Sequence, residues 1–218
     1  MNVFQPGSYT AIVADGTFPQ HEIPLSYLKN AERVVCCDGS ASSLILAGLE
    51  PDAIVGDMDS LSEELANRYA DRIFRDESQD TNDLTKVVDW CRENSFRDII
   101  IIGATGKRED HTLGNISLLT EYAKDMNVIM VTDTGILRPF LTDAEIESFP
   151  GQQVSLFSID PETEVTSNGL KYPLTKTKIT NWWFATLNEA LGERFTLQFT
   201  QGRIIVYSKF SEADLKNL

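Results

Sequence analysis

The first 133 residues alternate between short apolar runs rich in β-branched side chains and longer amphipathic stretches. Alternation of this kind predicts strand–helix units, which build a mostly parallel sheet with helices on its faces. Runs with apolar side chains on both faces, such as residues 99–102, are typical of strands buried inside such a sheet. We therefore expect strands at 8–14, 33–38, 53–57, 72–75, 98–104 and 127–133, and helices near 40–47, 61–70, 82–94 and 111–124.

After about residue 134 the pattern changes to short apolar segments without a long helical period. Turn-forming pairs stand among them, Asn-Gly at 168–169 and Gln-Gly at 201–202. This pattern predicts a small antiparallel β-domain, a sandwich or a barrel. We expect an α/β domain at residues 1–133 and an all-β domain at 134–218. The β segments expected in the second domain are 152–159, 178–187, 194–201 and 203–210.

The chain carries 19 Lys and Arg against 33 Asp and Glu, a formal net charge of −14. A surface of this sign repels nucleic acid and anionic lipid, so neither is expected as a partner. There is no apolar run of about 18 residues that would predict a membrane span, and the first residues do not resemble a signal peptide. Cys36, Cys37 and Cys91 have no paired spacing, which favours buried, reduced thiols. These features together predict a cytoplasmic protein.

Acidic side chains stand where two of the predicted strands end. Asp38 closes one of these strands, and Asp57 and Asp59 follow another. Ligands of a parallel sheet bind beyond the carboxyl ends of its strands, so these acids are placed to meet a ligand. If the chain stays extended, Asp57 and Asp59 point to the same side, about 6–7 Å apart. Without a cation they would repel each other, and Mg²⁺ prefers carboxylates, waters and substrate phosphates as ligands.

Two further segments add groups suited to phosphate. Asp83 and Lys86 are i,i+3 neighbours in a predicted helix. A turn with Gly103 and Gly106 leads into another helix and offers backbone N–H groups to an anion. Arg108 and Lys86 can add charge-assisted hydrogen bonds to phosphate oxygens. The sequence therefore predicts that Mg²⁺ and phosphate bind together at one edge of the sheet.

Two familiar phosphate motifs are excluded, one by its spacing and the other by a missing aspartate. The stretch GATGKR at 103–108 lacks the spacing of a P-loop, GxxxxGK[ST]. The stretch ADGT at 14–17 resembles the DxDGT nucleophile motif of haloacid-dehalogenase phosphatases, but Val13 stands where the first aspartate is required. His111 is a candidate general base, although a histidine in the first turn of a helix is more often a packing or hydrogen-bonding residue.

Taken in order, these segments resemble the bacterial thiamine pyrophosphokinase family over nearly the whole chain. The stretches that carry the resemblance are VADGTFP, CCDGSAS, PDAIVGDMDS, SQDTNDLTK, GATGKREDHTLGN, SNGLKYPL and ATLNE. The resemblance implies a Rossmann-like N-terminal α/β domain, a C-terminal β-sandwich and a homodimer with thiamine bound between subunits. It also implies transfer of a pyrophosphoryl group from ATP to the hydroxyl of thiamine, which yields thiamine diphosphate and AMP.

The resemblance assigns roles to residues that match the family's motifs. The implied Mg²⁺ ligands are Asp38, Asp57, Asp59 and Asp83, and the implied catalytic residues are Asp57, Asp59, Asp83 and Lys86. The positions implied to hold the nucleotide and its phosphates are Gly39, Gln79, Gly103, Arg108, Asp110, His111 and Asn115. The positions implied to lie near the thiamine ring are Tyr172 and Asn188.

Three residues depart from the family pattern. Lys107 replaces a usual glycine and adds a cation, Asn82 replaces a usual threonine, and Leu187 replaces the serine that usually precedes the asparagine. The change at Leu187 removes a hydroxyl that could contact the substrate ring. These departures affect contacts with the substrate ring more than binding of the metal.

Two other functions remain open on the residues alone. One is a different Mg²⁺-dependent transferase, of the nucleotide-sugar or nucleotidyl type, that uses Asp57-Met58-Asp59 as a DxD motif. The other is a non-catalytic sensor of thiamine or nucleotide that keeps the same fold. Release of AMP only when thiamine is present would distinguish the kinase from both.

Overall fold

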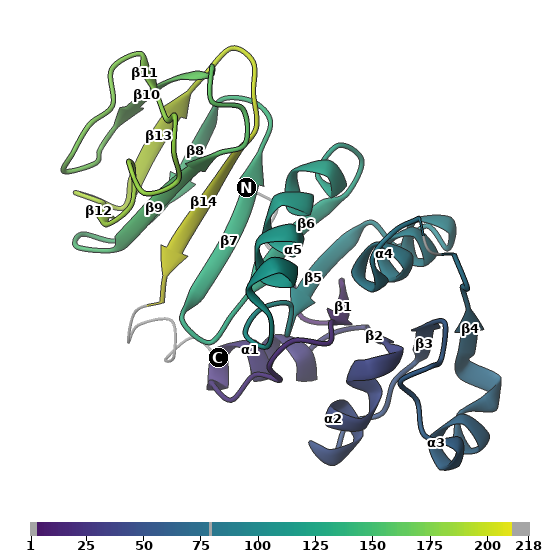
Figure 1. Ribbon diagram of the computed structural model, residues 1–218. Coiled ribbons are helices and arrows are strands. Elements are labelled where there is room, and N and C mark those ends of the chain that lie inside the picture. The colour runs from purple at the N-terminus through teal and green to yellow at the C-terminus, as the bar shows by residue number, and fades with distance from the viewer. Residues whose placement is uncertain (1–3, 79, 211–218) are drawn as a thin grey trace. The chain divides into compact units, whose positions relative to one another are not determined.

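The computed structural model describes residues 4–78 and 80–210 of the chain. These residues form two compact units (Figure 1). The first, called the α/β unit, comprises the described residues up to 116 together with 125–133. The second, called the β unit, comprises 117–124 and the described residues from 134 onward.

Parallel strands build the sheet of the α/β unit, and they lie in the order β6-β5-β1-β2-β3-β4. Along the chain the sheet grows outward from β1 to β4 and then returns, so that β5 pairs with the other side of β1. The strand order therefore reverses between β1 and β5, where open α/β sheets bind their ligands. The strands are β1 (Thr10–Val13), β2 (Arg33–Cys37), β3 (Ala53–Gly56), β4 (Ile73–Arg75), β5 (Asp98–Ile102) and β6 (Asn127–Val131).

Helices connect these strands, and the predicted alternation of strand and helix is confirmed. The α-helices are α1 (Glu22–Lys29), α2 (Ala41–Leu46), α3 (Glu63–Arg68), α4 (Asp83–Glu93) and α5 (Glu109–Tyr122), with 3₁₀ turns η1 (Asp38–Ser40) and η2 (Ala70–Arg72). Helix α4 buries Leu84, Val87, Val88 and Cys91, which recur at helical spacing, and it packs on β2 and β3. Packing of this apolar face fixes where the amino end of α4 lies.

Helix α1 is absent from the elements expected from the sequence. Its N-cap is His21, whose Nδ1 accepts a hydrogen bond from the backbone N–H of Ile23. Histidine is not among the usual N-cap residues, so the cap gives no clear signal in the sequence. Pro24 in the first turn is compatible with a helix start, and it is the sequence feature that could have indicated α1.

The β unit is an antiparallel sandwich, as expected. One sheet has the order β12-β9-β14-β7, and the other has the order β11-β10-β13-β8. Side chains from both sheets share one core, which includes Val154, Val206, Val165 and Phe195. The strands are β7 (Gly135–Phe140), β8 (Ala144–Glu147), β9 (Gln153–Ser158), β10 (Glu164–Asn168), β11 (Thr177–Lys178), β12 (Asn188–Glu189), β13 (Arg194–Gln198) and β14 (Ile204–Lys209).

The strand expected at 178–187 is wrong for most of its length. Strand β11 ends at Lys178, and the following residues form turns in which the N–H of Phe184 bonds to the carbonyl of Asn181. Trp182 donates its ring N–H to the carbonyl of Ser158, whereas Trp183 is 73% exposed. The aromatic composition suggested a strand, but contacts with the sandwich hold a turn instead. Strands β7, β8, β10 and β12 are also absent from the expectations.

Two expectations about the whole chain can be compared with the structure. Cys36, Cys37 and Cys91 are all buried and free, as predicted. Among the described residues, no helix combines the length and the apolar character needed to cross a membrane.

Candidate active site

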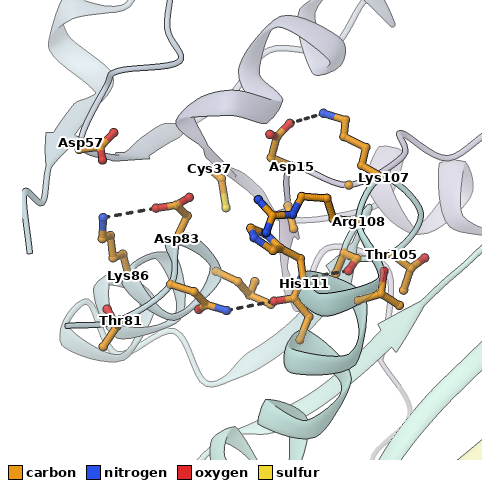
Figure 2. Close-up of a pocket in the computed structure, with 17 residues that line it drawn as sticks. Asp15, Cys37, Asp57, Thr81, Asp83, Lys86, Thr105, Lys107, Arg108 and His111 are labelled. Atoms are coloured by element: carbon orange, nitrogen blue, oxygen red, sulfur yellow. Dashed lines mark hydrogen bonds and ion pairs between the residues drawn. The ribbon is translucent and has the colours of Figure 1, made fainter. Parts of the chain in front are cut away.

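A pocket of about 490 Å³ opens at the carboxyl ends of the strands of the α/β unit. Its walls are the loops that follow β1, β3 and β5, the end of β2, and the amino ends of α4 and α5 (Figure 2). The pocket therefore lies at the point where the strand order reverses, which is the expected ligand site of such a sheet. The following residues line it: Ala14, Asp15, Gly16, Cys37, Asp57, Thr81, Asn82, Asp83, Leu84, Lys86, Ala104, Thr105, Lys107, Arg108, His111, Thr112 and Asn115.

Asp38 holds the loop after β3 by a hydrogen bond and does not line the pocket. Its Oδ1 accepts a hydrogen bond from the N–H of Gly39 at 2.8 Å, and its Oδ2 accepts one from Met58 at 3.0 Å. Gly56 leaves room for this contact, because a Cβ there would lie 2.8 Å from the carboxyl carbon of Asp38. Burial, together with the nearby carboxylates of Asp83 and Asp57, raises the pKa of Asp38 despite the hydrogen bond from Gly39. Asp38 therefore positions Met58 and, with it, the neighbouring acids.

Asp57 and Asp59 do not continue an extended strand. Strand β3 ends at Gly56, and Met58 has a φ of 71°, in the left-handed region. The extended geometry considered for the sequence is therefore not formed. Asp57 lines the pocket, while Asp59 is exposed and donates its backbone N–H to Oδ1 of Asp57 at 3.1 Å. This hydrogen bond, helped by the ammonium group of Lys86, lowers the pKa of Asp57.

Helix α4 contributes an acid and a base from its first turn. Its N-cap Asn82 accepts a hydrogen bond from the N–H of Thr85 at 2.9 Å and so satisfies one free N–H of the helix start. Lys86 Nζ lies 3.3 Å from Oδ1 of Asp83, in the i,i+3 pairing expected from the sequence. The Lys86 side chain is only 2% exposed, whereas that of Asp83 is 54% exposed. A nearly buried ammonium group is thus held at the pocket wall.

Asn115 on α5 connects two walls of the pocket through its hydrogen bonds. Its Nδ2 donates to the carbonyl of Ala104 at 2.9 Å, and its Oδ1 accepts from Nδ2 of Asn82 at 3.1 Å. These bonds connect α5, the loop after β5 and the start of α4. Asn115 therefore fixes the pocket walls relative to one another.

The loops after β1 and β5 are fastened together by their backbones. The N–H of Gly16 donates to the carbonyl of Gly103 at 2.6 Å, and the N–H of Thr17 donates to that of Thr105 at 2.7 Å. A Cβ at Gly16 would lie 2.4 Å from both carbonyl oxygens, so only glycine permits this approach. Gly103 has a φ of 69°, which also favours glycine. Gly103, one of the two glycines predicted to form a phosphate-binding turn, thus helps to fasten the two loops, and Gly16 lines the pocket.

Cationic side chains of the loop after β5 are each matched by an acid. Lys107 Nζ lies 2.6 Å from Oδ1 of Asp15, and Arg108 forms two hydrogen bonds with Asp110. The guanidinium of Arg108 lowers the pKa of Asp110 to about 2. Figure 2 shows the Lys107–Asp15 pair apart from the Lys86–Asp83 pair, with Arg108 and His111 between the two.

The pocket collects many of the residues singled out in the sequence but not all of them. Those that line it are Asp57, Asp83, Lys86, Arg108, His111 and Asn115. Those in the same loops that do not line it are Asp38, Gly39, Asp59, Gly103 and Asp110. Gln79 lies outside the described residues. Asp15 and Cys37 line the pocket but were not predicted as site residues from the sequence, and Lys107 was noted only as a difference from the family pattern. Their position at or after the ends of apolar strands is the sequence feature that could have indicated them.

The two residues assigned to the thiamine ring belong to the β unit. Asn188 is buried, and its amide donates to the carbonyl of Tyr172 at 2.8 Å and accepts from the N–H of Tyr172 at 3.0 Å. The Tyr172 residue itself is 61% exposed. Leu187 is 78% exposed and has a φ of 56°. Asn188 therefore holds the backbone at Tyr172, which leaves the aromatic ring at the surface.

Family models match both parts of the chain. The model described as "Thiamin pyrophosphokinase, catalytic domain" matches residues 25–131, and the model described as "Thiamin pyrophosphokinase, substrate-binding domain" matches residues 135–207. Thiamine pyrophosphokinase of Bacillus subtilis is 30% identical over 207 residues, which cover 89% of this chain and 95% of that protein. Thiamine pyrophosphokinase 2 of Arabidopsis thaliana is 28% identical over 78% of this chain and 74% of that protein.

Solved structures agree with these relatives. A crystal structure of thiamine pyrophosphokinase from Bacillus subtilis has a TM-score of 0.77 and 26% identity, and the match covers 93% of this chain and 99% of the other. That of thiamin pyrophosphokinase from Geobacillus thermodenitrificans has a TM-score of 0.76 and 27% identity over 94% of this chain and 99% of the other. The chain therefore belongs to the thiamine pyrophosphokinase family, enzymes whose known reaction transfers the pyrophosphoryl group of ATP to thiamine.

Proposed function

We propose that the pocket of the α/β unit binds ATP and that this chain makes thiamine diphosphate and AMP there. The observation that carries the proposal is the meeting of Asp57, Asp83, Lys86 and Arg108 in one pocket at the switch point of the sheet. In this proposal residues 1–133 supply the nucleotide site and residues 134–218 supply contacts to thiamine. The free, buried cysteines favour a cytoplasmic location, where thiols stay reduced.

In the proposed reaction the hydroxyl oxygen of thiamine attacks the β-phosphorus of ATP. The bond from that phosphorus to the α–β bridging oxygen breaks, AMP leaves with the electron pair, and the proton of the attacking hydroxyl passes to water or to a carboxylate. Negative charge therefore grows on the bridging oxygen and on the oxygens of the transferred group. Lys86 and Arg108 are the pocket cations placed to stabilise this charge. Because Lys86 is already fixed at the wall, it needs little reorganisation when the charge appears.

We propose Mg²⁺ as the metal, with Asp57 and Asp83 among its ligands and Asp59 and Asp38 in support. Among the described residues, no group of three or more acidic, histidine or cysteine side chains could hold a metal ion. Mg²⁺ usually binds through one or two carboxylates together with waters and substrate phosphates, and Asp57 and Asp83 in the pocket lining offer such carboxylates. Both carboxylate oxygens of Asp38 already accept backbone hydrogen bonds, so Asp38 suits an indirect role. When bound, Mg²⁺ neutralises phosphate charge and aligns the phosphates.

The thiamine ring is proposed to bind beside Tyr172, at an interface between two copies of the chain. The β unit exposes a set of large apolar side chains that would be covered in such a dimer, namely Tyr172, Trp183, Phe184, Leu187 and Leu191. The thiazolium ring is cationic, and aromatic faces attract cations. The exposed aromatic rings among these residues therefore support both the substrate contact and the pairing of subunits.

Aspartate in place of Leu187 and Leu191 together tests the dimer. We expect sedimentation analysis to show a dimer for the unmodified protein and a monomer for the double variant, because two carboxylates would be buried in the interface. Since the site would then be incomplete, KM for thiamine should rise about tenfold or more, equivalent to about 1.4 kcal/mol. Leu46→Asp is the matched control, because Leu46 is 89% exposed on α2 of the other unit. A monomeric unmodified protein with full activity would rule out the interface.

An assay that scores AMP and thiamine diphosphate together tests the proposed reaction. With ATP, Mg²⁺ and thiamine, we expect the two products in a one-to-one ratio and no AMP when thiamine is left out. Chelation of divalent metal by EDTA should stop turnover, and added Mg²⁺ should restore it. AMP release that ignores thiamine would favour another transferase. Tight thiamine binding without turnover of ATP would favour a sensor.

A further inference from the structure

Lys107 and Asp15 form an ion pair that joins two walls of the pocket. Asp15 follows β1 and Lys107 follows β5, and both line the pocket. Their side chains are 44% and 55% exposed, so the pair lies where the pocket meets solvent (Figure 2). Exposed ion pairs contribute little to folding stability, which means that little is lost when such a pair opens. The pair is therefore poorly explained as a device for stability alone.

The backbone beneath Lys107 is held firmly. The N–H of Gly106 donates to Oγ1 of Thr112 at 3.2 Å. A Cβ at Gly106 would lie 2.1 Å from Oγ1 of Thr17, which shows how closely the two loops meet beside Lys107. An exposed ammonium arm thus extends from a backbone that bonds to α5 and packs against the loop after β1. This arrangement lets Lys107 change its partner while the pocket wall stays in place.

Asp15 is the less exposed member of the pair, at 44% against 55% for Lys107. It lies against the turn after β2, where a Cβ at Gly39 would be 2.7 Å from its carboxyl carbon. This packing contact keeps Asp15 beside the pocket when Lys107 turns toward a ligand. Its carboxylate then competes with the ligand for the ammonium group and repels an anionic ligand.

The charges of the pocket lining balance before any ligand binds. The acids are Asp15, Asp57 and Asp83, and the cations are Lys86, Lys107 and Arg108. ATP adds several negative charges to this balanced set, in a chain of net charge −14. Because Lys86 is almost buried beside Asp83, the more exposed Lys107 can follow the phosphates more readily.

Building on the ATP site proposed above, we propose that Lys107 is a phosphate-positioning residue that exchanges the carboxylate of Asp15 for a phosphate oxygen of ATP. Asp15 holds the ammonium group over the pocket until the nucleotide arrives. A polyphosphate offers more negative charge and more acceptor oxygens than one carboxylate, so it displaces Asp15 as the partner of Lys107. Lys107 and Asp15 thereby have opposite effects on nucleotide affinity.

Calorimetric titration with MgATP and with adenosine tests the exchange. Lys107→Met should raise Kd for MgATP about tenfold, because a charged hydrogen bond to phosphate is lost. Asp15→Asn should lower Kd for MgATP about two- to fivefold, because the competing charge is gone. Neither variant should change Kd for adenosine, which carries no phosphate. Lys178→Met is the matched control, since Lys178 forms an exposed pair with Glu162 in the other unit and its loss changes net charge equally.

The direction in which Asp15→Asn changes Kd for MgATP distinguishes the exchange from an ion pair that only links the two loops. If the pair only links the loops, Asp15→Asn and Lys107→Met will both raise Kd for MgATP, and the exchange is refuted. It is also refuted if Lys107→Met leaves Kd for MgATP unchanged or alters that for adenosine equally. Binding of MgATP by the unmodified protein without formation of thiamine diphosphate would refute the proposed reaction and leave the exchange standing. No binding of MgATP at all would refute both.

Discussion

Replacement of Asp57 by Asn is expected to lower kcat by about 10²–10³-fold while the fold stays intact. The amide keeps the size of the carboxylate and an oxygen that can still accept the N–H of Asp59. The negative charge is lost, and with it the proposed hold on Mg²⁺ and the alignment of the phosphates. Removal of one preorganised electrostatic group typically has an effect of this size. Steady-state kinetics at saturating ATP, thiamine and Mg²⁺ measures the change, and circular dichroism checks the fold.

Two comparison variants make the Asp57 result specific. Asp71→Asn removes one negative charge from an exposed position in η2, outside the pocket, and should leave kcat within twofold. Asp59→Asn is expected to abolish turnover, because the family resemblance implies that Asp59 is a magnesium ligand, although Asp59 does not line the pocket. Near-normal turnover of Asp57→Asn with saturating Mg²⁺ would remove the central support for the proposed site. Near-normal turnover of Asp59→Asn alone would restrict the metal site to Asp57 and Asp83.

Lys86→Met is expected to lower kcat by about 10²–10³-fold and to raise the melting temperature at the same time. Methionine fills a similar volume but carries no charge that must be removed from water when the helix packs. Asp83 remains half-exposed and keeps its hydration, so no buried acid is left unpaired. A gain of about 1 kcal/mol would raise Tm by about 2–4 °C in a chain of this size. Calorimetry and the coupled product assay measure the two effects on the same preparation.

Lys124→Met is the matched control for Lys86. Lys124 also forms an i,i+3 ion pair with an acid, Glu121, but its side chain is 59% exposed. Its replacement should change neither kcat nor Tm appreciably, because exposed pairs contribute little. A fall in kcat together with a rise in Tm for Lys86→Met, but not for Lys124→Met, would show that the charge of Lys86 serves activity and not stability. A fall in Tm together with kcat would instead show that Lys86 supports the fold.

The architecture of the chain was largely readable from its sequence. Runs such as residues 99–102 are apolar on both faces, as is typical of a strand covered on both sides by helices, and the structure buries all four. The sequence pattern gave wrong or missing elements where local signals and tertiary contacts disagree. The aromatic segment at Trp182 and Trp183 has the composition of a strand, yet a turn forms because Trp182 anchors to Ser158 on β9. Helix α1 was missed because its cap, His21, is an unusual one.

The candidate site was readable only in part. Asp83 and Lys86 are three residues apart in a helix, so their pairing follows from helical geometry, and the sequence showed it directly. The roles of Asp57 and Asp59 did not follow from their spacing, because Met58 adopts a left-handed φ that ends the extended geometry. Asp38 carried the same sequence signal as these acids, yet burial directs it to the backbone of Gly39 and Met58.

The sequence by itself determined the strands and most of the helices of the α/β unit, together with the identity of the groups that can bind phosphate, because these follow from local periodicity and side-chain chemistry. Only the tertiary structure decided which of those groups share a pocket. Lys107 and Asp15 lie 92 positions apart and meet at 2.6 Å because β5 pairs with β1 and brings their loops together. Pairing between distant strands is set by packing of the whole sheet, and no short stretch of the chain encodes it.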